Sequence, residues 1–89
     1  MKAVITVTGK DSVGIIADVS AVCAKVGANI LEITQSVLSE YFAMIMIVDI
    51  DALNLPFADF SEEIGELGRN RGLDIRALHE DIFDAMHRI

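Results

Sequence analysis

One seven-residue stretch, TGKDSVG at residues 8–14, separates two segments with different apolar periodicities. Residues 2–7 alternate in the manner of a β-strand. Residues 13–26 carry apolar side chains three and four positions apart, which is typical of an amphipathic helix. The chain therefore begins with a strand and a helix joined by a short turn, and the rest of the fold has to be compatible with this unit.

The same stretch contains the residues of a tight turn and of an anion site. Gly9 can adopt a positive φ without steric cost, so the chain can turn sharply where the strand ends. Asp11 or Ser12 can cap the helix through a side-chain oxygen, and Gly14 leaves the first helical turn without a Cβ atom. The first N–H groups of a helix lack partners within the helix and can bind a carboxylate. On local sequence alone, a purely structural turn and a ligand site both remain open.

Two segments are predicted to be helices of one core. The first runs from about residue 13 to residue 26 and is ended by Gly27, which suits a left-handed residue after the helix. Its apolar stripe comprises Ile16, Val19, Cys23 and Val26, flanked by Ile15 and Val22. The second begins at Pro56, which favours a first helical position, and ends at Gly72. Its apolar stripe comprises Phe57, Phe60, Ile64 and Leu67.

Small residues form a second edge on each predicted helix at the same spacing. On the first helix these are Ala17, Ala21 and Ala24, and on the second Ser61, Gly65 and Gly68. We expect the two edges to face each other and to allow close helix packing. On this basis, Gly65→Leu is expected to destabilise the fold, although it improves helix propensity.

Three further segments are predicted to be strands, at residues 29–38, 41–50 and 73–80. The middle one is apolar on both faces, so both faces need to be covered. The last residues, 81–89, form a short amphipathic tail that we expect to dock on the domain or on a second subunit. The resulting order, β-α-β-β-α-β, predicts an α+β, ferredoxin-like domain with a four-stranded antiparallel sheet and two helices on one face.

Composition limits the function of this domain. Apolar residues make up 53% of the 89 residues, more than one small core usually absorbs, which suggests burial against a second copy in a homodimer. The net charge of −7 argues against partners with a phosphate backbone and against anionic membranes. The sequence shows no signal peptide and no 18-residue apolar run, so we expect a cytoplasmic protein.

No catalytic or metal-binding pattern is evident. The single cysteine, Cys23, excludes an intrachain disulfide and any CxxC motif, and a buried position in the core is its simplest interpretation. His79 and His87 lack the spacing of a metal site. The turn has no arginine for a phosphate, and the first strand has no aromatic residue for RNA. We therefore expect a protein that is not an enzyme and has neither cofactor nor metal.

The chain resembles the ACT domain, a small-molecule-sensing regulatory module. The resemblance rests on VTGKDSVGIIA at residues 7–17 followed by GANI at residues 27–30. EYF at residues 40–42 and IFDAM at residues 82–86 make it closest to the short, stand-alone ACT-domain proteins. The resemblance covers about residues 3–78, so we expect a single ACT-like domain over residues 1–89, with a core at 3–78 and a tail at 81–89.

The resemblance also implies where a ligand would bind. ACT domains that bind amino acids hold them between the strand-to-helix turn of one subunit and the second strand of the other. Carried over to this chain, the ligand-binding residues are Gly9, Lys10, Asp11, Ser12, Val13, Gly14, Asn29 and Ile30. Many ACT domains carry Arg-Pro where this chain has Ser12-Val13. Binding at this turn is thus expected without an arginine, through backbone N–H groups, Asp11 and a neighbouring chain.

Two functions follow from this resemblance. The first is a non-catalytic regulatory module that senses an amino acid or a similar metabolite at a homodimer interface. Because no catalytic domain is fused, such a module would act in trans on another, unidentified protein. The alternative is a dimerisation or protein-interaction module without a small-molecule ligand, whose turn is only structural.

Overall fold

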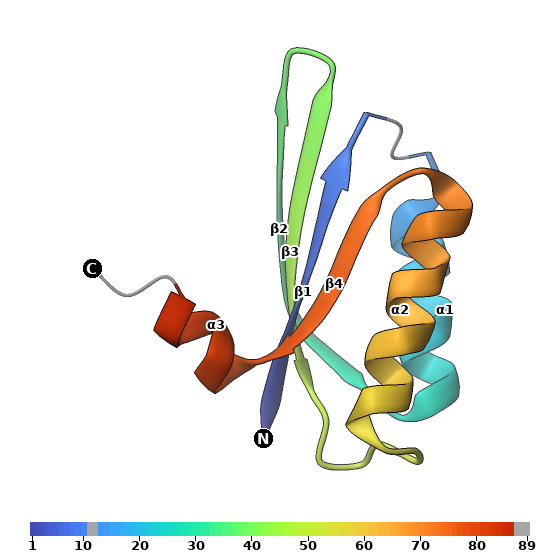
Figure 1. The fold of residues 1–89 in the computed structure, drawn as a ribbon, viewed down its shortest axis with the longest axis vertical. Helices are drawn as coiled ribbons and strands as arrows, with labels where there is room; N and C mark the ends of the chain where they lie inside the picture. Colours follow the sequence, from blue (N-terminus) through green and yellow to red (C-terminus); the bar gives the residue numbers. More distant parts are fainter. Residues whose placement is uncertain (11–12, 87–89) are drawn as a thin grey trace.

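A four-stranded antiparallel sheet forms the centre of the protein and carries two helices on one face (Figure 1). The structure is a computed structural model that describes residues 1–10 and 13–86. Its elements are β1 (Lys2–Gly9), α1 (Ile15–Val26), β2 (Asn29–Leu38), β3 (Tyr41–Asp49), α2 (Phe57–Arg71), β4 (Asp74–His79) and α3 (Glu80–Met86). The predicted β-α-β-β-α-β order and fold class are confirmed.

The strand order is β2-β3-β1-β4, so β2 and β4 form the two edges of the sheet. Two rows of paired residues mark its ends. Lys2 lies opposite Asp49, which lies opposite Asn29 at the start of β2. At the other end, Gly9 lies opposite Phe42, which lies opposite Val37. The β1–α1 turn therefore begins at the end of the sheet where β2 finishes.

The core lies between the sheet and the two long helices. One face of β1 and β3 contributes side chains that are almost completely buried, namely Ala3, Ile5, Val7, Phe42, Met44, Met46 and Val48. Phe60 and Ile64 of α2 are fully buried against this face, and burial of each such side chain contributes roughly 1.5–3 kcal/mol. This confirms the predicted apolar stripe of the second helix.

The buried stripe of α1 differs from the predicted one by one residue. Ile15, Val19, Cys23 and Val26 are buried, whereas Ile16 is 37% exposed. The helix begins at Ile15 rather than at Val13. Counted from Ile15, the positions i, i+4, i+8 and i+11 face the sheet. Gly27 (φ +83°) and Gly72 (φ +69°) end the two helices in the left-handed conformation, as predicted.

The predicted contact between the two small-residue edges is wrong. Ala17, Ala21 and Ala24 are exposed, and on α2 Ser61 and Gly68 lie against β4 and the residue before it instead of against α1. The Ser61 hydroxyl donates to the carbonyl oxygen of Ala77 (3.3 Å). A Cβ atom at Gly68 would lie 2.8 Å from the Leu73 carbonyl oxygen. Gly68 therefore permits close packing of a helix on a strand, not of two helices.

Alanine substitutions at Gly65 and Gly68 are expected to have opposite effects on stability. A Cβ atom at Gly65 would meet only the tip of the Arg69 side chain, at 3.3 Å, so Gly65→Ala should stabilise the fold by about 0.5–1 kcal/mol. At Gly68 the Cβ would approach backbone as well as Cγ1 of Ile75 (2.9 Å), so Gly68→Ala should destabilise it by about 1–3 kcal/mol.

Urea unfolding of the two variants beside the wild type measures this difference. Equal effects of the two substitutions would contradict the packing of α2 on β4. The earlier expectation for Gly65→Leu has lost its basis, because among the described residues the Arg69 side chain, and not the backbone of α1, lies within 4 Å of a Cβ atom at Gly65.

The opposite face of the sheet is only partly covered. α3 lies on this face, away from α1 and α2 (Figure 1), and contacts β1 and β4. On the half formed by β2 and β3, Tyr41 is 54% exposed and Ile45 is 42% exposed. The prediction that β3 is apolar on both faces is thus confirmed. The described part of the tail, α3, contacts β1 and β4 and leaves Tyr41 and Ile45 exposed.

Candidate functional site

α1 begins directly after a glycine of the β1–α1 turn. Gly14 occupies the cap position with φ +75°, a conformation that other residues rarely adopt. No side chain in the described part of the chain caps this end, and the Gly14 carbonyl oxygen accepts the first helical bond, from the N–H of Asp18 (3.0 Å). The predicted capping by Asp11 or Ser12 falls outside the described residues.

Gly9 has a different role from the predicted one. It belongs to β1, and its φ is not positive. A Cβ atom at Gly9 would lie 2.1 Å from Cδ2 of Leu73, the residue just before β4. Gly9 therefore allows Leu73 to pack on the end of the strand, while Gly14 provides the left-handed turn.

An arginine from α2 lies against the turn. The Arg71 guanidinium donates from Nη2 to the Val13 carbonyl oxygen and from Nη1 to the Asp18 carboxylate. A Cβ atom at Gly14 would lie 3.7 Å from Nη2, so the guanidinium covers the bare face of this glycine. The Arg71 side chain is only 30% exposed. An arginine distant in sequence thus lies against the turn, although residues 8–14 contain none.

The other predicted residues of the turn do not all converge on this arginine. Lys10 points to the β2–β3 hairpin, where its Nζ lies 3.8 Å from Glu40 Oε2 and 5.6 Å from the ring centroid of Tyr41. Val13 and Gly14 lie beside Arg71.

Asn29 and Ile30 lie at the other end of the sheet. Asn29 shares a row with Lys2, seven residues before Gly9 on β1. At about 3.3 Å per residue this separation is roughly 23 Å. One chain cannot bring the turn and the start of β2 to the same small ligand, so the two halves of the predicted site can meet only between two chains.

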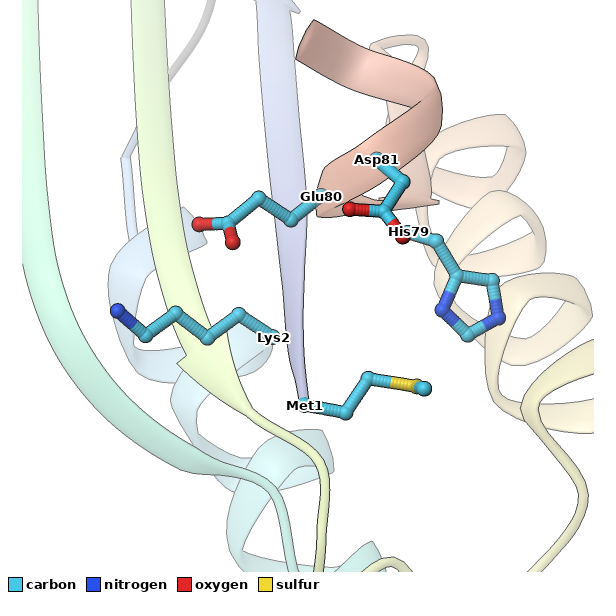
Figure 2. Close-up of a pocket in the computed structure, with 5 residues that line it drawn as sticks. All are labelled: Met1, Lys2, His79, Glu80 and Asp81. Carbon is cyan, nitrogen blue, oxygen red and sulfur yellow. The ribbon is translucent and has the colours of Figure 1, made fainter.

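A pocket of about 370 Å³ lies at the sheet end where Asn29 is found, near the chain's first residues. It is lined by Met1, Lys2, His79, Glu80 and Asp81. Figure 2 shows Lys2 and Glu80 extending to one side of β1, whereas Met1 and His79 extend to the other. The His79 ring packs on Phe57, with 4.0 Å between the ring centroids. Among the described residues, no group of three histidine, cysteine or acidic side chains could hold a metal ion.

Cys23 is a core residue rather than a reactive thiol. It is 1% exposed, and burial raises its pKa from the ordinary value of 9.0 to about 11. The folded protein thus keeps the thiol protonated at a pH where the unfolded chain releases the proton. The stability that this burial contributes is fully present below pH 9 and falls as the pH rises toward 11.

The expected loss is up to about 2–3 kcal/mol at pH 11. Urea unfolding between pH 8 and 11 measures it, with Cys23→Ala as the control for every change in stability that does not come from the thiol. If the wild type and Cys23→Ala lose equal stability over this pH range, burial does not raise the pKa of the thiol as described.

Known proteins of similar sequence or structure identify the family of this chain. The family model described as "ACT domain" matches residues 2–77. A UPF0237 protein of Clostridium acetobutylicum is 45% identical over 89 residues, covering all of both chains. A UPF0237 protein of Methanocaldococcus jannaschii is 43% identical over 88 residues, 99% of this chain and 98% of the other.

Among solved structures, an ACT domain protein from Streptococcus pneumoniae is similar to this chain with a TM-score of 0.80. The two are 41% identical, and the match covers 98% of each chain. The chain therefore belongs to the ACT domain family and matches its small UPF0237 members over their whole length.

Proposed function

We propose that this protein is a non-catalytic regulatory module that binds an amino acid or a similar small metabolite at the β1–α1 turn, between two copies of the chain. ACT domains are typically regulatory modules that bind ligands, and they commonly dimerise. The observation that carries the proposal for this chain is the half-buried Arg71 guanidinium beside Gly14 at the open end of α1.

The chemistry of the turn suits a carboxylate. The first N–H groups of α1 and the guanidinium both favour a negative group, and a guanidinium binds a carboxylate through two parallel hydrogen bonds. The helix end alone contributes only about 0.3–1 kcal/mol at an exposed site, so the guanidinium is needed for useful affinity. Asp18 and the Val13 carbonyl hold Arg71 in place, and its remaining N–H groups can reach a ligand. The absence of a Cβ atom at Gly14 leaves room for the guanidinium beside the first turn of α1.

The second half of the site would come from the partner's β2. This strand is at the edge of the sheet, and its backbone can pair with another chain. Leu31, Ile33 and Val37 on β2 are 48%, 39% and 71% exposed. A side-by-side dimer through β2 would cover these side chains and bring Asn29 and Ile30 of one chain toward the turn of the other.

Removal of the guanidinium is expected to abolish most of the ligand-induced stabilisation. A panel of amino acids and small carboxylic acids is screened for a rise in Tm of the wild type, and the hits are repeated with Arg71→Gln. Loss of a charged hydrogen-bond partner should weaken binding about tenfold. Arg69→Gln is the matched control, because among the described residues Arg69 forms an ion pair only with the exposed Glu62 on α2 (2.9 Å). A ligand site at this turn would be contradicted if no compound of the panel raised the Tm. It would also be contradicted if the hits stabilised Arg71→Gln as much as the wild type.

A second candidate function is dimerisation or protein interaction without a small ligand. The exposed apolar side chains of Tyr41 and Ile45 on the open sheet face favour it, together with Ile82 and Met86 on α3, which are 49% and 63% exposed.

In either function the module would act on a separate, regulated protein, and we propose that it does so in the cytoplasm. No helix among the described residues is long and apolar enough to cross a membrane.

A further inference from the structure

α3 forms a groove with the sheet face that lies opposite α1 and α2. The helix contacts β1 and β4, but of its side chains Phe83 is half-buried and Met86 is 63% exposed. A space of about 360 Å³ remains between the helix and the sheet. This volume is at the lower end of the roughly 300–1,000 Å³ of small-molecule sites.

The floor of the groove consists of two polar cross-strand pairs. Thr6 on β1 lies opposite Arg76 on β4, and Thr8 lies opposite Asp74. All four alternate with core residues, so their side chains share the face that α3 covers. Arg76 Nε donates to Asp74 Oδ1 at 3.0 Å. A guanidinium and a carboxylate are thereby held side by side, with a hydroxyl group across from each.

The wall of the groove is apolar. It is formed by Leu78 at the end of β4 and by Phe83 and Met86 on α3. Methionine and phenylalanine together fit aliphatic and aromatic groups of different shapes, because the methionine side chain is flexible and polarisable. The groove thus has a charged half of both signs and an apolar half.

We propose that this groove binds a small zwitterion with an apolar substituent, such as an α-amino acid with a branched aliphatic side chain. The guanidinium has N–H groups besides Nε that can donate to the ligand carboxylate, while Asp74 can accept from the ligand ammonium. The threonine hydroxyls can serve either group. The substituent would lie on Phe83 and Met86, where it loses contact with water.

Ligands of other chemistry fit this groove less well. A simple anion would face the Asp74 carboxylate as well as Arg76. A simple cation would face Arg76. A purely apolar molecule would cover the Arg76–Asp74 pair without replacing its water, which costs free energy. The groove belongs to a single chain, so its occupancy depends neither on a dimer nor on the ligand site at the β1–α1 turn.

Amide NMR of the full chain tests this inference with three probes of nearly equal shape. L-leucine carries both charges, 4-methylpentanoate only the carboxylate, and 3-methylbutylamine only the ammonium. Leucine is expected to shift the amide signals of β1, β4 and α3 in a saturable way, and the other two probes about tenfold more weakly. Arg76→Gln and Asp74→Asn should each weaken leucine binding about tenfold. The control Arg69→Gln, which loses a similarly exposed ion pair on α2, should not.

Several results would overturn the inference. These are no saturable shift with leucine, equal binding of leucine and 4-methylpentanoate, or unchanged binding to Arg76→Gln. Shifts confined to Val13, Gly14 and the end of α2 would also overturn it, while supporting the ligand site at the turn. Conversely, groove shifts that persist in Arg71→Gln would support the groove even if the turn binds nothing.

Discussion

Gly27→Ala is expected to lower the free energy of unfolding by about 3 kcal/mol, which is one of the largest effects of any single methyl group in this chain. Gly27 has φ +83°, and a Cβ atom there would lie 2.5 Å from the Ala52 carbonyl oxygen. The left-handed conformation costs a non-glycine residue about 1–2 kcal/mol. The close approach to backbone, which cannot rotate away as a side chain can, adds about 1–3 kcal/mol.

Gly72→Ala is the matched control for this prediction. Gly72 also ends a helix in the left-handed conformation (φ +69°), but a Cβ atom there would meet nothing within 4 Å. Its substitution should cost only the conformational part, about 1 kcal/mol. In a domain of this size the two variants should melt roughly 12–24 °C and 4–8 °C below the wild type. Similar losses for both would show that contact with Ala52 does not limit position 27.

Gly27 lies close to Ala52 because the loop after β3 packs against the segment that joins α1 to β2. The loop after β3 packs on the end of α1, where the Asn54 N–H donates to the Val26 carbonyl oxygen (2.9 Å) and its side chain donates to that of Lys25 (3.0 Å). These bonds satisfy carbonyl groups that the helix itself leaves without partners. Gly27 therefore allows the chain to leave α1, pass close to the loop backbone at Ala52 and begin β2 at Asn29.

Much of the fold could be predicted because periodicity and glycine position act locally. The bounds of β2 at residues 29–38, the reversal at Ser39 and the C-terminal ends of both long helices are as predicted. Pro56 was predicted as the first residue of the second helix, but it is the cap, and α2 begins at Phe57. The small-residue edges were misassigned because spacing along a helix does not reveal which neighbour it faces. Gly68 is compatible with a helix or a strand as a neighbour, and only the tertiary packing places β4 there.

The candidate site was predictable only in part. The turn and its left-handed glycine follow from the sequence, although the positive φ belongs to Gly14 and not to Gly9. Arg71 was missed because it lies 58 residues from Val13 in the chain. A signal was present, however. In the predicted topology the last turn of α2 lies beside the first turn of α1, so a cation just before Gly72 is placed near the turn.

The double substitution Ile33→Lys and Val37→Lys is expected to dissociate the proposed dimer. Both residues lie on the edge strand β2, where lysine opposes pairing with another strand. Their side chains are 39% and 71% exposed, so the monomer fold should lose little stability. The dissociation constant should rise at least about 100-fold, because a dimer would have to bury the new charges. Analytical ultracentrifugation over a range of protein concentrations measures it.

Tyr41→Lys with Ile45→Lys is the matched double variant on the open sheet face. A side-by-side dimer through β2 survives this change, whereas a dimer through the open face is lost. The ligand adds a second criterion, because the turn and Asn29 lie too far apart to share a small molecule within one chain. If the β2 variant is monomeric yet still gains the full Tm shift from the ligand, the turn binds without a partner, and the contribution of Asn29 and Ile30 has to be abandoned.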